Sequence, residues 1–485
     1  MKITLFENDA QKGSLIVFTL KNKESINHNA PEEYAGLVES YLNNSGFSSA
    51  VGESVLIVAK NNRQIILCGC GKEENFKQDH LRRAIGKGLK NSRANKATQV
   101  AVLKPNWSLE SLEIHWVQLV SETIYLSLYE YNKYLSNKSV FEIEEITIQC
   151  DRVNENTQAA LKKGSVLGHS TTIARDLINE PAIDLYPETL AKKVIELGKC
   201  YGFDVQIFNA DQCHGMGMHA LMAVGQASTR KPHLIVMRWI GGSNMEPIGL
   251  IGKGVTYDTG GLSLKPTNSM AHMKSDMGGA ANVIATMCAL ARLGSKKNVV
   301  GVVAAAENAV AGNAYKPGDV IRSMNGKTIE IGNTDAEGRL TLADAITYAI
   351  QKEHANTIID IATLTGAVKV ALGDHRAGIV STDNSLVNAA YSASEKADEG
   401  FWQLPIDDEY RSLNSSEIGE IKNIGRDGLA GTITAAAFVE AFTENLPWLH
   451  IDIAGVCFFR KDHEYISKGG SGRPMRSLYH LVENL

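Results

Sequence analysis

Residues 279–306 read GAANVIATMCALARLGSKKNVVGVVAAA, an apolar helical pattern followed after a short break by a continuous apolar run. The run at 299–305 has the length and the valine content of a strand that is buried on both faces. Another short apolar run, at 248–251, precedes this stretch. A strand, a helix and a second strand in this order predict a right-handed βαβ unit with parallel strands.

The same alternation continues on both sides of this unit. Together the runs predict an α/β fold whose mixed, largely parallel sheet is covered by helices on both faces. The expected strands lie at 234–239, 248–251, 299–305 and 357–362, and the expected helices at 279–293, 340–353 and 433–443.

The first 150 residues predict a second, smaller α/β domain. Short β-rich runs at 55–59 and 64–68 are separated by a four-residue turn, and residues 79–97 have a helical pattern. A helical stretch that ends before Pro181 would connect the two domains. We therefore expect a small N-terminal α/β domain at 1–152, a linker helix at 153–180 and a larger C-terminal domain at 181–485, which contains the functional segments described below.

Length and composition limit the class of protein. The chain has 485 residues, of which 44% are hydrophobic, enough for a large core. Its 49 basic and 54 acidic residues give a formal net charge of −5, whereas dedicated nucleic-acid binders are usually basic. No apolar run approaches the roughly 20 residues that span a bilayer, and no secretory signal is evident. Seven scattered cysteines favour a reducing compartment, so we expect a cytoplasmic protein without membrane contact.

Polar, glycine-rich segments follow the expected strands of the C-terminal domain. In such sheets, functional residues gather beyond the carboxyl ends of the strands. Without a cation, several carboxylates in one place would repel each other, and oxygen ligands favour Mg, Mn or Zn. Four carboxylates exceed the need of one ion and predict a pair of divalent ions with shared ligands. The four are Asp258, Asp276, Asp335 and Glu337.

Each of these carboxylates also has an ordinary structural interpretation. Asp276 could cap a helix, and Asp335 and Glu337 could favour the positive end of a helix dipole. Lys253 could simply pair with Asp258. Their joint occurrence in loops after strands favours the metal site. The chain has no H-E-x-x-H motif, so we do not expect single-zinc protease chemistry.

Three of these segments resemble the leucyl aminopeptidases, the M17 cytosol aminopeptidase family. They are NTDAEGRL at 333–340, GKGVTYDTGG at 252–261 and MKSDMGGAA at 273–281. Further blocks in the same order are ARDLINEPA at 174–182, ATLTGA at 362–367, HIDIAG at 450–455 and GRP at 472–474. The resemblance implies a metal-dependent aminopeptidase that releases N-terminal amino acids, preferably leucine and other apolar residues, from short peptides.

The resemblance also implies the ligands of two divalent metal ions. Asp258 and Glu337 would bridge the ions; Asp335 would bind one of them, and Lys253 and Asp276 the other. A lysine ligand has to be neutral, so metal binding would displace its proton. The ions would be Mn or Zn, with Mg or Co as alternatives, and a metal-bridging hydroxide would attack the scissile carbonyl.

Two more residues have a catalytic role by resemblance. Lys265 would polarise the scissile carbonyl, and Arg339 would anchor a bicarbonate ion that acts as the general base. Tyr257 stands where phenylalanine is common in the family, which leaves the ligands untouched. Members of the family form homohexamers, and we expect one here. The residues implied to bind substrate are Met273, Asn333, Thr363, Gly366, Ala454 and Cys457.

Two other functions stay open at this point. A two-metal phosphoesterase uses similar carboxylates, although a lysine at a metal position argues against it. The stretch 77–104, with eight lysine and arginine residues and one acidic residue, could bind nucleic acid or another anion. A solvated helix face is the simpler interpretation of such a charge run. His272 is a candidate base, but a lone histidine is more often solvated or packed.

Overall fold

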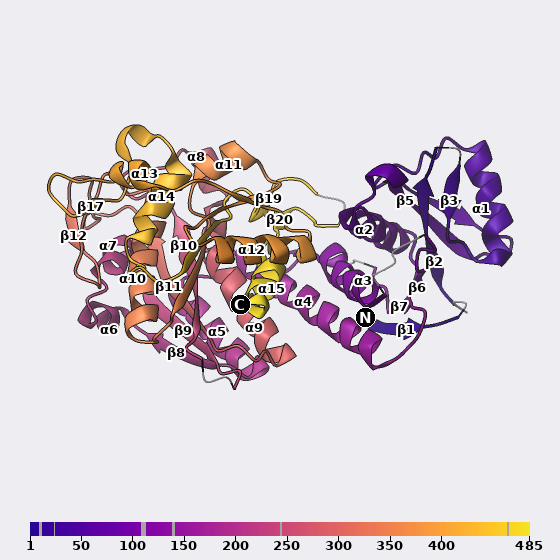
Figure 1. Cartoon of the computed structure of the whole chain (residues 1–485), viewed down its shortest axis with the longest axis horizontal. Coiled ribbons are helices and arrows are strands. Elements are labelled where there is room, and N and C mark those ends of the chain that lie inside the picture. The colour runs from indigo at the N-terminus through magenta and orange to yellow at the C-terminus, as the bar shows by residue number, and fades with distance from the viewer. Residues whose placement is uncertain (9–11, 24, 108–112, 138–140, 243–244, 463–464) are drawn as a thin grey trace. The chain divides into compact units, whose positions relative to one another are not determined.

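The computed structural model of the chain consists of two compact units (Figure 1). It describes residues 1–8, 12–23, 25–107, 113–137, 141–242, 245–462 and 465–485. One unit comprises residues 1–172 and 461–468, and the other comprises residues 173–460 and 469–485. Helix α4 (Glu155–Asn179) contributes residues to both units. The domain limits expected from the sequence stay a prediction.

The first unit is built around a seven-stranded sheet with the order β1-β7-β6-β2-β5-β4 and with β3 paired to β2. Its strands are β1 (Lys2–Phe6), β2 (Ser14–Lys21), β3 (Ile26–His28), β4 (Ser54–Val58), β5 (Gln64–Lys72), β6 (Gln99–Val102) and β7 (Glu145–Gln149). Its helices are α1 (Glu32–Asn44), α2 (Gln78–Ala94) and α3 (Glu113–Leu128). Strands β4 and β5 pair antiparallel, which confirms the predicted hairpin.

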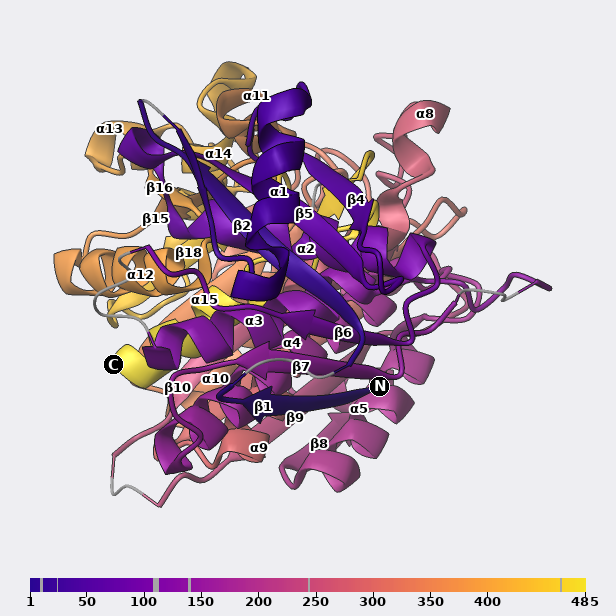
Figure 2. The ribbon, with the colours of Figure 1, turned by 90° about the vertical axis from the view of Figure 1, so that its right-hand side faces the viewer.

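The alternation of side chains along β2 explains why both faces of this sheet are covered. Ile16 and Phe18 belong to a core shared with α2 and α3, whereas Leu15 and Val17 belong to a second core shared with α1. Successive side chains of a strand point to opposite faces, so a continuous apolar strand needs helices on both sides. Figure 2 shows α1 lying across β2 and β5.

The basic stretch 77–104 lies mainly on α2. At least four of its eight cations are paired with carboxylates of the same unit, and one of these pairs is fully buried. The stretch therefore offers fewer available charges than its composition suggests, and nucleic-acid binding by it stays an open alternative. The pairs are Arg82–Glu122 at 2.9 Å, Arg83–Asp79 at 2.6 Å, Arg93–Glu130 at 2.5 Å and Lys104–Asp151.

The second unit contains an eight-stranded sheet with the order β16-β15-β18-β14-β10-β11-β9-β8. Neighbours β14, β10 and β11 are parallel, as are β14 and β18, whereas β8, β9 and β15 contribute antiparallel pairs. The predicted mixed, largely parallel sheet is thus confirmed. The strands are β8 (Asp204–Phe208), β9 (His233–Trp239), β10 (Ile248–Asp258), β11 (Val299–Asn308), β14 (Thr357–Ala362), β15 (Ala377–Val380), β16 (Phe401–Gln403) and β18 (Trp448–Asp452).

Two smaller sheets complete the strands of this unit. One consists of β12 (Val320–Arg322), β13 (Thr328–Glu330) and β17 (Ile421–Lys422), and the other of β19 (Phe458–Phe459) and β20 (Gly469–Gly470). The helices are α5 (Pro187–Tyr201), α6 (Ala210–Gly215), α7 (His219–Gly225), α8 (Thr267–Met270), α9 (Gly278–Leu293), α10 (Gly338–Gln351), α11 (Gly366–Leu372), α12 (Asn384–Ala397), α13 (Asp408–Ser412), α14 (Gly431–Glu440) and α15 (Met475–Asn484).

Helices pack on both faces of the large sheet. Ile251 of β10 belongs to a core with α7, α10 and α14, and the next residue, Gly252, lies against Ala280 of α9 on the opposite face. The start of α9 approaches the sheet so closely that a Cβ atom on Gly279 would collide with the carbonyl oxygen of Ile361. Only glycine allows this approach, which brings the segment before α9 to the end of β10. Among the described helices, none is long and apolar enough to cross a membrane.

We predict that Gly279→Ala lowers the thermal unfolding midpoint of the protein. The added methyl group overpacks the contact between α9 and β14, which costs about 1–3 kcal/mol. Gly215→Ala is the matched control, because a Cβ atom there has nothing within 4 Å. Calorimetry should show a clear decrease for the first variant and almost none for the control. Equal midpoints would contradict the close approach of α9.

Candidate active site

Asp258 is the last residue of β10, and its carboxylate is buried beyond the end of the strand. Its Oδ1 accepts hydrogen bonds from the backbone N–H of Gly260 and from Asn308 Nδ2, both at 2.8 Å. Asn308 ends the neighbouring parallel strand β11, so the two strand ends hold the carboxylate together. The position agrees with the rule that functional residues follow the carboxyl ends of strands.

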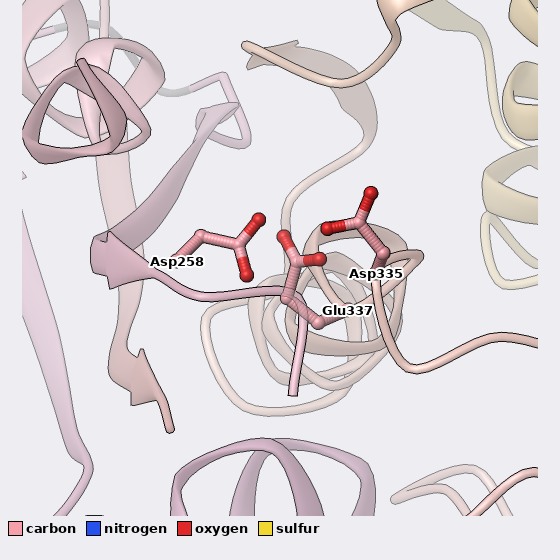
Figure 3. A group of neighbouring side chains, drawn as sticks. All are labelled: Asp258, Asp335 and Glu337. Atoms are coloured by element: carbon pink, nitrogen blue, oxygen red, sulfur yellow. The ribbon is translucent and has the colours of Figure 1, made fainter. Parts of the chain in front are cut away.

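Asp335 and Glu337 come from the loop before α10 and face Asp258 (Figure 3). One oxygen from each of the three carboxylates lies within 4.8 Å of the others. Glu337 is the N-cap residue of α10, yet its side chain makes no capping hydrogen bond. Asp276 is not the cap of α9 either, since Met277 has that position. The capping interpretation of Asp276 is therefore wrong.

Lys253 connects Asp276 to this cluster from the middle of β10. Its Nζ lies 2.8 Å from both carboxylate oxygens of Asp276 and 2.9 Å from Glu337 Oε1. It also donates to the carbonyl oxygen of Thr363 at 2.9 Å. Gly338 leaves room for the lysine, because a Cβ atom there would lie 2.7 Å from Nζ. Lys253 thus pairs with Asp276 and Glu337 and not with Asp258.

A second lysine closes the other side of the cluster. Lys265 Nζ lies 2.8 Å from Asp258 Oδ2 and 2.5 Å from Asp335 Oδ1. Burial lowers the pKa of Lys265, but the surrounding carboxylates, Asp258 foremost, outweigh burial and raise it above its usual value. In the protein without metal ions, this side chain is therefore an ammonium group.

Burial disfavours the charged form of the carboxylates in the cluster. Burial raises the pKa of Asp276 well above its ordinary value, although Lys253 opposes the shift. Burial raises the pKa of Asp258 as well, and the charge of Glu337 adds to that shift. For Lys253, burial lowers the pKa, while the charges of Asp276, Glu337 and Asp258 raise it further than burial lowers it. Four carboxylates in this space outnumber the two lysines, so the site favours additional positive charge.

The donor set fits divalent metal ions. Glu337 Oε2 is buried and accepts no hydrogen bond from any residue that the structure describes. Asp335 Oδ1 and Asp276 Oδ2 are paired only with lysine. Carboxylate oxygens together with one amine nitrogen form a ligand set suited to Mn or Zn.

Arg339 lies in the first turn of α10 and is buried beside the cluster. Its Nη1 donates to the carbonyl oxygen of Asn423 at 2.7 Å, whereas Nε has no hydrogen-bond partner in the described part of the chain. Burial lowers the pKa of Arg339 to about 10, so the guanidinium is still charged at neutral pH. A buried cation with an unused donor is suited to bind a small anion.

The cluster lies in a cavity of about 520 Å³. The cavity wall includes both lysines, Arg339 and three of the four carboxylates. It also includes all six residues expected to bind substrate, which are Met273, Asn333, Thr363, Gly366, Ala454 and Cys457. The structure thus gathers the expected site residues from distant segments, and the individual roles stay predictions. A larger hollow in the first unit, of about 910 Å³, has a single carboxylate, Glu39, in its wall.

Sequence reasoning missed three residues that support the site. Asn308 holds Asp258, and Tyr315 donates to the carbonyl oxygen of Thr334 at 2.8 Å, next to Asp335. Asp452 is fully buried and accepts hydrogen bonds from the backbone N–H of Leu364 at 3.1 Å and from the hydroxyl of Thr365 at 2.6 Å. Asn308 could have been recognised as the polar residue that ends an apolar strand. The others depend on contacts between distant segments.

The fold and the site together define a class of protein. A sheet whose central parallel strands end at a buried cluster of carboxylates and lysines, open to a cavity, is the arrangement of an α/β enzyme that works with divalent metal ions. More specifically, the chain belongs to the cytosol aminopeptidase family. The family's catalytic domain matches residues 172–479, and its N-terminal domain matches residues 16–138.

Individual relatives agree with this assignment. A probable cytosol aminopeptidase of Clostridium perfringens is 44% identical over 430 residues, which cover 87% of this chain and 86% of the relative. A probable cytosol aminopeptidase of Alkaliphilus oremlandii is 38% identical and matches over the full length of both chains. The chain is therefore an aminopeptidase, and thus a hydrolase.

Solved structures show the same fold. A mutant of tomato leucine aminopeptidase superimposes with a TM-score of 0.90 at 28% identity, covering 100% of this chain and 97% of that one. The bottromycin maturation enzyme BotP in complex with Mn superimposes with a TM-score of 0.85 at 28% identity, covering 97% and 99%.

We predict that Mn or Zn raises the thermal unfolding midpoint of the metal-free protein. A ligand that binds only the native state at 100 times its Kd stabilises it by about 2.7 kcal/mol. Glu337→Gln should remove most of this increase, because it neutralises a carboxylate at the centre of the cluster. Glu395→Gln, at an exposed position of α12, should keep the full increase. An equal response of both variants in a thermal shift assay would contradict the site.

Proposed function

We propose that this aminopeptidase uses two divalent metal ions to release N-terminal amino acids, preferably leucine and other apolar residues, from short peptides. The main support is the convergence of Asp258, Asp335 and Glu337 within 4.8 Å of one another, with Lys253 beside them. A two-metal phosphoesterase, the alternative from the sequence, has no support in the family assignment.

The two ions would share the cluster. Asp258 and Glu337 would bridge them, Asp335 would bind one ion, and Lys253 and Asp276 would bind the other. The ions would be Mn or Zn, with Mg or Co as alternatives; the name of one structural relative records Mn. When bound, such ions lower the pKa of water and polarise a carbonyl group. The ammonium group of Lys253, which is paired with Asp276 and Glu337, would have to lose one proton to bind a metal ion.

Lys265 would keep its proton and act on the substrate. Its ammonium group is held by Asp258 and Asp335, at the edge of the cavity. Once other cations compensate these carboxylates, the ammonium can donate to the scissile carbonyl oxygen and stabilise the negative charge that develops there. The two lysines, twelve positions apart in the sequence, would thus have opposite protonation states.

Arg339 would bind the general base. Its buried guanidinium with an unused Nε donor supports an anion site, and bicarbonate is the anion that we propose. A base held there would take the proton of the attacking water. No side chain of the cavity wall other than the cluster carboxylates and His272 could serve as a base near neutral pH.

The selectivity for chain ends and for apolar residues follows from the same cavity. Only the first residue of a peptide has a free α-amino group that can bind at the cluster. Its side chain would contact an apolar part of the wall formed by Met273, Thr363, Gly366, Ala454 and Cys457. Asn333 would also bind the substrate. The cytoplasmic location and the homohexamer stay predictions.

We predict that a chelator abolishes the cleavage of leucine amide and that Mn, Zn or Co restores it. The carboxylates would lack the cations that activate water and polarise the substrate. Initial rates, measured before chelation, after chelation and after re-addition of each ion, test this. Full activity in the chelator would overturn the metal requirement.

We also predict that Lys265→Met lowers kcat by a factor of about 10²–10³, the effect of removing one donor to a developing oxyanion. KM for leucine amide should change much less, because the donor acts mainly in the transition state. Lys352→Met, at an exposed lysine after α10, is the control and should leave both constants unchanged. A normal kcat for Lys265→Met would contradict the proposed role.

A further inference from the structure

The outer part of the active-site cavity carries positive charge that the proposed reaction does not use. Lys369, Arg460 and His272 line the cavity together with the metal cluster. Lys369 and Arg460 are exposed and form no ion pair with any residue in the described ranges. The only carboxylates in the cavity wall belong to the cluster itself. Unpaired cations at this position are notable in a chain whose net charge is −5.

These three basic side chains, here called the basic rim, lie next to the wall that we assign to the first side chain. His272 precedes Met273, and Arg460 follows Cys457 by three positions. Lys369 lies three positions after Gly366 on α11, which places both on the same helix face. Each of the three side chains thus comes from a segment that also supplies part of that wall.

Contacts between these segments hold the rim together. The rings of His272 and Phe458 lie 5.2 Å apart, which brings the segment before α9 against the segment of Arg460. A Cβ atom on Gly455 would lie 3.7 Å from Lys369 Cα, so α11 packs on the loop that contains Ala454 and Cys457. Burial lowers the pKa of His272, and the charges of Arg460 and Lys369 lower it further, which is consistent with the three side chains being near one another. His272 is therefore mainly neutral at neutral pH, and Lys369 and Arg460 supply the positive charge of the rim.

From this placement we infer that the basic rim binds a carboxylate at the end of the substrate's first side chain, so that the enzyme also releases N-terminal glutamate. The inference rests on the proposed function, because it uses the same orientation of the peptide. A glutamate side chain follows the path of leucine along the apolar wall, and its carboxylate oxygens extend one bond beyond the leucine methyl groups. Long, flexible lysine and arginine side chains can reach such a carboxylate while their charges stay at the surface.

The test compares glutamyl and glutaminyl p-nitroanilides, which have the same shape but differ in charge. Neither substrate has a C-terminal carboxylate, so any preference must come from the first side chain. We expect kcat/KM to be at least about tenfold higher for the glutamyl substrate, in the range of a charge-assisted hydrogen bond. The ratio should fall toward one as salt is added, because the rim is exposed to solvent.

Variants connect the preference to the rim. Lys369→Gln and Arg460→Gln should each lower the ratio about three- to tenfold, and Lys369→Glu should invert it. Lys352→Gln, an exposed lysine outside the cavity, should leave the ratio as in the wild type. Both substrates are measured with the same preparation of each variant. Partial loss of folded protein therefore lowers both rates equally and does not change the ratio.

Two results would overturn the inference. One is a wild-type ratio of one or less, or a ratio that the rim variants do not change. The other is that the rim variants change the preference for Leu-Gly over its C-terminal amide and leave the glutamyl preference unchanged. This result would assign the rim to the free C-terminus of the peptide. Cleavage of leucyl p-nitroanilide by the wild-type enzyme is measured in parallel. If this cleavage is absent, the proposed function is contradicted. If it is present without a glutamyl preference, only the inference about the basic rim is contradicted.

Discussion

The repulsion among buried carboxylates at the end of β10 is the constraint on which the rest of the site depends. Asp258, Asp276, Asp335 and Glu337 share one small space, and burial, which is only partial for Asp335, makes their charges costly. Without metal, Lys253 and Lys265 compensate part of this charge. The same space can exchange ammonium groups for metal ions, which explains how lysine can belong to a metal site.

The fold provides this space through close approach of backbone segments. Gly279 lets α9 start against the sheet, and Gly338 lets Lys253 extend beside the start of α10. Asp452 then ties the loop after β14 by hydrogen bonds to Leu364 and Thr365, so that the carbonyl of Thr363 points at Lys253. Small residues and a buried acceptor around the cluster thus determine where its charges lie.

Much of the sheet could be predicted from the sequence, because its buried strands are short apolar runs between helical patterns. The strand β10 is the instructive case: its apolar half was recognisable, but it continues through Lys253 to Asp258, where glycine, lysine and threonine weaken the strand pattern. The site residues were recognisable as a group, since polar loops after parallel strands converge at one edge of a sheet. The ion pairs of Lys253 and the support from Asn308, Tyr315 and Asp452 depend on tertiary contacts that no local pattern encodes.

The central claim is that this cluster holds a pair of divalent ions. The most direct test is a count of metal bound per chain, by elemental analysis of the protein after loading with Mn or Zn and removal of unbound ions. We expect about two ions per chain for the wild type, as in other two-metal sites, and at most about one for Asp258→Asn, which alters a residue that we propose to bridge the ions. A wild-type protein that retains no metal, or a variant that retains as much as the wild type, would contradict it.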